Sequence, residues 1–154
     1  MKHFVAGGLA IIAASAPLSV SADSTVPVGQ TADVVVDVAS LRSSRGEVIA
    51  CLTGNPDRFP KCRDDRRAKR LSIAADSADH LVFRDVPPGR YAIALLHDEN
   101  GNGKADRALT MIPREGFGFS NDAKVRMGPP KFDDAAFRTT GADRRMRIRM
   151  RYML

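Results

Sequence analysis

The stretch Pro87-Pro88-Gly89-Arg90-Tyr91-Ala92-Ile93-Ala94-Leu95-Leu96 decides the class of fold. Its first three residues form a tight turn, because proline holds φ at the value that a turn needs and glycine can adopt a positive φ. After the turn, apolar residues occupy both faces of a strand that runs to Leu96. A strand that is apolar on both faces belongs in the middle of a sheet or sandwich. We therefore predict that this segment is a central strand.

Apolar residues recur with a period near two through most of the remaining chain, which is the pattern of strands. In the run from Asp33 to Val38, three valines share one face and two aspartates share the other. The same pattern predicts strands over 46–52, 69–73, 81–86 and 145–154, and a helical turn over 131–137. About seven short strands in one small domain indicate an all-β fold. We expect an antiparallel two-sheet sandwich of immunoglobulin-like or prealbumin-like type.

The first 22 residues have the three parts of a secretory signal peptide. Met1-Lys2-His3 is positive, residues 4–18 are apolar or small, and Val20-Ser21-Ala22 offers a cleavage site. The alternative is a membrane anchor, but an apolar stretch of about 15 residues is short of the roughly 20 that span a bilayer. We predict a cleaved signal peptide over 1–22, a flexible leader over 23–30 and one domain over 31–154. The product is then periplasmic or secreted, with no transmembrane segment after cleavage.

The charge and the cysteine content limit the classes of partner and of site that the protein can have. The mature chain keeps 23 Lys and Arg against 18 Asp and Glu. This moderate excess allows contact with acidic surfaces and does not imply nucleic acid, which an exported protein rarely meets. Outside the cytoplasm, the pair Cys51 and Cys62 favours a disulfide, worth about 3 kcal/mol in the chain-entropy model. Free buried thiols are the alternative, and no further Cys or His stands nearby for zinc.

Three motifs carry a resemblance to a known family. The run 83–92 resembles a hairpin common in prealbumin-like and carboxypeptidase-regulatory-like sandwiches. The runs 88–104, 113–121 and 128–135 are similar, in that order, to the exported bacterial family catalogued as domain of unknown function 2141. The resemblance extends from about Val34 to Tyr152, and the segment 107–112 departs from it, since a glycine and polar residues are expected there. It implies a secreted or periplasmic β domain and brings no established activity, ligand or catalytic residue.

The run from Asp98 to Asp106 fits the first nine positions of a calcium loop. Oxygens at alternate positions converge on one point, and Gly103 permits the sharp turn. Leu109 stands where an EF-hand has its bidentate glutamate, so we expect weak structural binding, in the ~10⁻⁴–10⁻³ M range. The predicted calcium ligands are Asp98, Asn100, Asn102, the carbonyl of Lys104, and Asp106. The alternative is a polar turn built from two Asn-Gly pairs, without metal.

Four arginines alternate with apolar residues near the end of the chain: Arg145, Arg147, Arg149 and Arg151. Side chains at i and i+2 of a strand point the same way, about 7 Å apart, so this face can hold phosphates or acidic glycans. The alternative is the solvated outer face of an edge strand, where charges discourage aggregation. Three phenylalanines are expected to close the open end of the sandwich, with a binding groove as the alternative: Phe117, Phe119 and Phe132.

Catalysis has little support in the sequence. The mature chain has two histidines, His80 and His97, and the adjacent Asp98 should point to the opposite face of a strand from His97. We therefore expect no enzyme. The main hypothesis is a non-enzymatic exported β-sandwich domain with a structural calcium loop that binds a cell-envelope partner. The alternative is a carrier or binding module for an anionic ligand, a phosphorylated glycolipid or an acidic glycan, on the arginine-lined face.

Overall fold

The structure, a computed structural model, describes residues 29–103, 107, 108 and 112–153. The predicted signal peptide over 1–22 and most of the predicted leader over 23–30 lie outside the described residues. Two of the predicted calcium ligands, Lys104 and Asp106, also lie outside them. Within the described ranges, no helix is long and apolar enough to cross a membrane.

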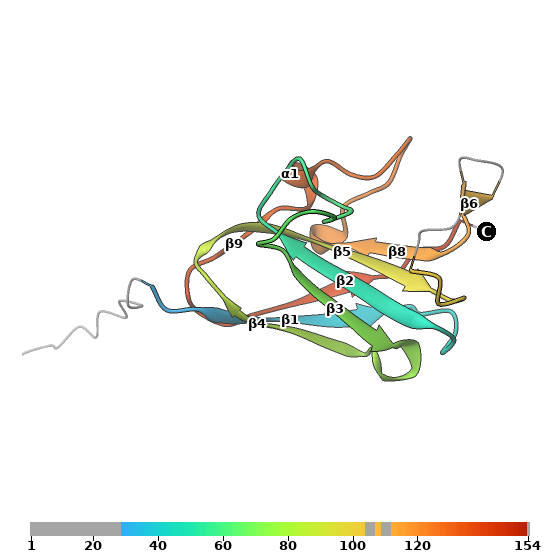
Figure 1. The fold of residues 1–154 in the computed structure, drawn as a ribbon, viewed down its shortest axis with the longest axis horizontal. Coiled ribbons are helices and arrows are strands. Elements are labelled where there is room, and N and C mark those ends of the chain that lie inside the picture. The colour runs from blue at the N-terminus through green and yellow to red at the C-terminus, as the bar shows by residue number, and fades with distance from the viewer. Residues whose placement is uncertain (1–28, 104–106, 109–111, 154) are drawn as a thin grey trace, which may run out of the picture.

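Two sheets pack face to face in a mostly antiparallel β-sandwich (Figure 1). The three-stranded sheet has the order β10-β1-β4, formed by Arg144–Arg149, Ala32–Ala39 and His80–Val86. The five-stranded sheet runs in the order β3-β2-β5-β8, with β9 paired to the start of β5. Its strands are Lys69–Ala74, Glu47–Thr53, Gly89–Asp98, Gly116–Phe119 and Phe137–Thr139. The remaining elements are η1 (Ala75–Ser77), β6 (Arg107–Ala108), β7 (Ile112–Pro113), η2 (Ser120–Asp122) and α1 (Phe132–Ala135).

The predicted central strand is confirmed, and one pairing differs from the prediction. β5 lies between β2 and β8 and pairs with both in antiparallel fashion. β10, however, pairs with β1 in parallel, with Met146 opposite Val36. The predicted antiparallel two-sheet sandwich is therefore confirmed as a mostly antiparallel one, with this single parallel pair among the described strands. An alternating apolar pattern reads the same in both strand directions, so it cannot fix the direction of a partner.

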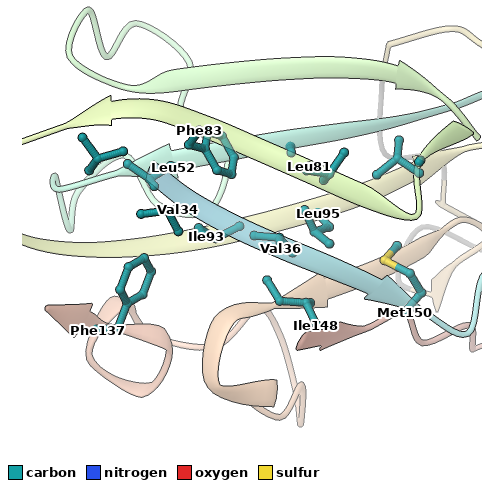
Figure 2. Close-up of a cluster of buried hydrophobic side chains, with 14 of the residues drawn as sticks. Val34, Val36, Leu52, Leu81, Phe83, Ile93, Leu95, Phe137, Ile148 and Met150 are labelled. Atoms are coloured by element: carbon teal, nitrogen blue, oxygen red, sulfur yellow. The ribbon is translucent and has the colours of Figure 1, made fainter. Parts of the chain in front are cut away.

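The main core fills the space between the two sheets (Figure 2). From the three-stranded sheet, the three valines predicted to share a face point inward, and two of them are fully buried. From the five-stranded sheet, the inward side chains of β5 meet them. Burial of one such side chain stabilises the fold by about 1.5–3 kcal/mol. The buried members labelled in Figure 2 are Val34, Val36, Leu52, Leu81, Phe83, Ile93, Leu95, Phe137, Ile148 and Met150.

A second apolar cluster covers the outer face of β5. It consists of Ala92, Ala94, Phe119, Ala123, Phe132 and Ala135, with Phe59 and Phe117 packed against them. The expectation that phenylalanines close the open end of the sandwich is therefore wrong. The reason lies in β8, whose alternate residues are glycines that face inward. A Cβ at Gly116 would lie 2.3 Å from the Tyr152 ring, so only glycine fits there and the phenylalanines face outward.

The Cys51–Cys62 disulfide is confirmed, with the two Cα atoms 6.4 Å apart. It ties the connection between β2 and β3 to β2. That connection also carries Phe59, whose ring centroid lies 5.8 Å from that of Phe119 and 6.0 Å from that of Phe132. The disulfide thus holds one side of the second cluster in place.

Candidate functional site

The predicted calcium loop begins at Asp98, the last residue of β5, which is fully buried. Its Oδ1 accepts hydrogen bonds from the backbone N–H groups of Gly101 and Asn102 at 2.8 and 3.2 Å. Its Oδ2 accepts one from Gly103 at 2.5 Å, and the Oδ1 of Asn100 accepts one from Asn102 at 3.1 Å. Gly101 and Gly103 adopt positive φ angles of 71° and 69°, which tight turns require. The carboxylate therefore organises this loop from its centre.

Metal binding by the loop stays a prediction. Three of its five predicted ligands belong to the described chain, whereas Lys104 and Asp106 do not. In the part of the chain that the structure describes, no group of three or more His, Cys, Asp or Glu side chains is placed to hold a metal ion. The hydrogen bonds to Asp98 are those of a polar turn built on Asn-Gly pairs.

His97 is fully buried, with both ring nitrogens engaged. Its Nε2 lies 2.8 Å from the carbonyl oxygen of Arg45, and its Nδ1 lies 2.7 Å from the hydroxyl of Tyr152. A carbonyl oxygen only accepts, so in the neutral ring Nε2 donates and Nδ1 accepts from the hydroxyl. The backbone N–H of Arg42 donates to the same hydroxyl oxygen at 3.1 Å. His97 and Asp98 thus have separate partners, and they do not form an acid–base pair.

Glu99 ties the end of β5 to the connection between β1 and β2. Its Oε2 accepts from Nε of Arg42 at 3.0 Å, and its Oε1 accepts from Oγ of Ser43 at 2.6 Å. The hydrogen bonds from Arg42, and then from Ser43, lower the pKa of Glu99 to about 2. The Arg42 guanidinium also lies 4.5 Å from the centroid of the Tyr152 ring, and burial raises the pKa of that phenol. We call this set the clasp: Arg42, Ser43, His97, Glu99 and Tyr152.

The clasp was not predicted from the sequence. Glu99 falls between the ligand positions of the calcium pattern, and its partners lie more than fifty positions away. No periodic signal connects such residues. The clasp fixes the start of the loop, since its carboxylate, imidazole and phenol all have partners.

Three predicted arginines are exposed on the outer face of the three-stranded sheet. Arg145 is engaged there, because its Nε and Nη2 each lie 2.8 Å from an oxygen of Asp37. This hydrogen bonding holds the pKa of Asp37 below its usual range, and His80 Nδ1 lies 2.7 Å from the same carboxylate. The guanidinium groups of Arg147 and Arg149 have no carboxylate within 4 Å among the described residues, although the backbone N–H of Arg149 donates to Oδ1 of Asp122 at 3.2 Å. We call these two residues the arginine pair.

The predicted ladder of four arginines is wrong at its last member. β10 ends at Arg149, and the backbone of Arg151 pairs with that of Phe117 in the other sheet, with N–O distances of 2.8 and 3.0 Å. The Arg151 side chain is only partly exposed, and its Nη2 donates to the carbonyl oxygen of Asp122 at 3.2 Å. The apolar alternation continues past Arg149 while the pairing partner changes, so the pattern alone did not show the crossing.

One family model matches most of the chain. It is described as an uncharacterized protein conserved in bacteria, DUF2141, and it matches residues 36–147. The chain belongs to this family. The matched part of this DUF2141 protein runs from the middle of β1 into β10, so it takes in both sheets, the loop after β5 and the clasp except Tyr152. No curated protein and no solved structure matches the chain.

This DUF2141 domain also has an open pocket of about 480 Å³ where the tail after β10 passes β8. Both apolar and cationic side chains line it. No motif in the sequence predicted this pocket. Its lining residues are Phe117, Lys124, Val125, Arg126, Arg151 and Met153.

Proposed function

We propose that this protein is an exported, non-enzymatic β-sandwich domain that binds an anionic component of the cell envelope, such as a phosphorylated glycolipid or an acidic glycan. The observation that carries the proposal is the arginine pair. Both side chains are exposed, and neither guanidinium group forms an ion pair with a described carboxylate. Arginine binds phosphate and carboxylate groups through two parallel hydrogen bonds, so a pair of free guanidinium groups suits such a ligand.

The position of the arginine pair on a strand adds to this. The backbone of β10 is held by its parallel pairing with β1, and buried Ile148 anchors the strand between the two arginines. Side chains at alternate positions are about 7 Å apart, which lets them contact two anionic groups of one polymer or two headgroups. A rigid base reduces the entropy that the protein loses when it binds.

Export is supported by two features. The Cys51–Cys62 disulfide is consistent with an oxidising compartment outside the cytoplasm. The first 22 residues also have the charge and apolar pattern of a signal peptide. A periplasmic or secreted domain meets anionic lipids and glycans directly.

The hydrogen bonds of the buried polar residues support a binding protein over an enzyme. His97 has both nitrogens engaged, and Asp98 accepts three backbone hydrogen bonds. A general base needs a free lone pair within reach of a substrate proton. Buried groups that are already paired do not offer one.

The test is retention of the mature protein on phosphocellulose, measured as the salt concentration that elutes it. We expect the variant Arg147→Ser/Arg149→Ser to elute at clearly lower salt than the wild type, because contacts with anions weaken as salt rises. The matched control is Arg66→Ser/Arg67→Ser, which removes the same charge from exposed positions before β3. Equal elution of the two variants would show that retention depends only on net charge. The arginine pair would then be only the solvated outer face of an edge strand.

We further propose that the loop after β5 takes calcium as a structural clip, with Asp106 completing the set begun by Asp98. The two glycine turns and the alternate placement of Asp98, Asn100 and Asn102 support it. Thermal melting should shift upward by several degrees in millimolar calcium relative to chelator, since a ligand of the folded state stabilises it. Asp106→Asn should remove most of that shift. An unchanged melting temperature would discard the clip and leave the arginine proposal intact.

A further inference from the structure

Two large apolar side chains are exposed in the described part of the chain, and both belong to one region. Met127 is fully exposed on the loop between η2 and α1, and Met153 is half exposed on the tail after β10. Figure 1 shows that the loop before α1 stands away from the two sheets. Exposed apolar groups that gather in one place mark an interaction surface.

The pocket described above lies between this loop and the tail. Phe117, Val125 and Met153 supply its apolar lining, and three cations border it: Lys124, Arg126 and Arg151. Met127 directly follows Arg126 in the chain. Apolar tips with cations beside them therefore share one surface, which we call the corner: Phe117, Lys124, Val125, Arg126, Met127, Arg151 and Met153.

The charge of the corner is unbalanced. The carboxylate of Asp122 lies 3.8 Å from Nη2 of Arg151 and is the only acid within 4 Å of a corner cation among the described residues. The Nη1 of Arg151 is buried and has no hydrogen-bond partner in the described part of the chain. A buried N–H of a charged group without a partner costs free energy until an acceptor reaches it. The corner is thus complementary to an anion.

The corner rests on a rigid base. The Oγ of Ser120 in η2 donates to the carbonyl oxygen of Ala135 at 2.5 Å and accepts from the backbone N–H of Ile93 at 2.9 Å. The tail is held by its backbone pairing with Phe117. The segments that carry the exposed methionines therefore start from residues that are fixed to the five-stranded sheet.

We propose that the corner docks on an anionic lipid surface. Met127 and Met153 enter the apolar boundary of the bilayer, while Lys124, Arg126 and Arg151 contact the headgroup phosphates. This proposal adds to the proposed function a second surface, separate from the arginine pair, and names its anionic partner as a membrane. A lipid surface fits better than a small enclosed ligand, because the pocket is open and Met127 projects outward. Apolar residues flanked by cations bind membranes through apolar burial and electrostatic attraction together.

The experiment is cosedimentation of the mature protein with vesicles of phosphatidylcholine, alone or with about one-third phosphatidylglycerol. We expect binding to the anionic vesicles and little binding to the neutral ones. Met127→Ser/Met153→Ser keeps every charge and should weaken binding about tenfold, because two apolar side chains no longer leave water. Lys124→Ser/Arg126→Ser should weaken binding roughly 30-fold, at about a factor of five per cation.

The control is Arg66→Ser/Arg67→Ser, which removes two charges at the opposite edge of the five-stranded sheet and should bind like the wild type. All substituted side chains are exposed or half exposed, and melting curves verify that each variant folds. Wild-type binding by the methionine variant would overturn the lipid proposal. Absent vesicle binding with retained binding to phosphocellulose would overturn it while the proposed function stands. If the wild type binds neither the anionic vesicles nor phosphocellulose, both the lipid proposal and the proposed function are overturned.

Discussion

The outer faces of the two sheets differ in what covers them. On the three-stranded sheet, charged side chains of β1 and β10 meet water, and Asp37 pairs there with Arg145 and His80. On the five-stranded sheet, η2, α1 and the disulfide-bonded connection cover β5 with a second apolar cluster. One face is open and polar, and the other is closed and apolar.

The difference follows from the residues at alternate positions. β1 places Asp33 and Asp37 on its outer face, whereas β5 places Ala92 and Ala94 there. A sheet face without polar side chains must be covered to remove it from water. Stability is therefore shared between two cores, while the open face and the corner remain available for contacts. Four changes test this division, and they are ordered here by expected size.

The largest effect is expected at Phe119, which is buried in the second cluster. Phe119→Ala should lower the free energy of unfolding by about 3–5 kcal/mol, because it removes a buried ring and leaves a cavity. Urea unfolding followed by circular dichroism measures the loss. The comparison is Val35→Ala on the open face, which should cost about 1 kcal/mol or less. Similar losses for the two variants would refute the distinction between the faces.

The next effect concerns the Cys51–Cys62 disulfide. Replacing both residues by alanine should destabilise the protein by about 3 kcal/mol, because the unfolded chain gains freedom. The connection that holds Phe59 against the cluster also becomes looser. A double-mutant cycle with Phe59→Ala measures whether disulfide and ring act together. Strictly additive losses would show that the disulfide does not support the cluster.

A smaller effect is expected at Glu99, where the clasp joins the connection from β1 to the end of β5. Its folded pKa of about 2 lies below the ordinary glutamate value of 4.5, so the folded state binds fewer protons between these values. The stabilisation is present above about pH 4.5 and is lost as pH falls toward 2. Glu99→Gln should cost about 2 kcal/mol at pH 7, allowing for the partial exposure of Arg42.

The measurement for Glu99 is unfolding by urea at several pH values. The difference between the wild type and Glu99→Gln should shrink from pH 6 to pH 2, by the linkage between protonation and stability. A difference that stays constant over this range would contradict the role of the carboxylate charge.

The smallest effect is expected on the open face. Asp37→Asn removes the pairing with Arg145 and His80 and should lower the free energy of unfolding least of the four changes, because water screens exposed pairs. The pKa of Asp37 is lowered by Arg145, so this contribution is present at neutral pH and lost on acidification. Salt should reduce it as well. A loss comparable to that of Phe119→Ala would make the open face part of the structural core.

Much of the fold was predictable because burial leaves a pattern in the strands. The alternation of valine and aspartate fixed the faces of β1, and the two-sided apolar run placed β5 in a sheet interior. β8 was missed because Gly116 and Gly118 carry no side chain that a period of two can register. The need for glycine becomes clear only in the structure, where Tyr152 lies against Gly116 and Ile148 lies against Gly118.

The candidate sites were less predictable, for a related reason. Asp98 and the loop amides are close in sequence, so the turn was visible as a motif. The clasp and the corner each join segments that are distant along the chain, and polar contacts of this kind have no period. Arg151 illustrates the limit, since its place depends on which sheet the tail joins after Arg149.

The parallel pairing of β10 with β1 has a consequence for the order in which the fold is completed. Asp37 and Arg145 are 108 positions apart, yet they lie on neighbouring strands. During synthesis from the amino terminus, β1 emerges long before its partner and carries an open row of hydrogen-bonding groups. The three-stranded sheet is therefore completed only when the last strand has emerged, and the chain needs protection from aggregation until then.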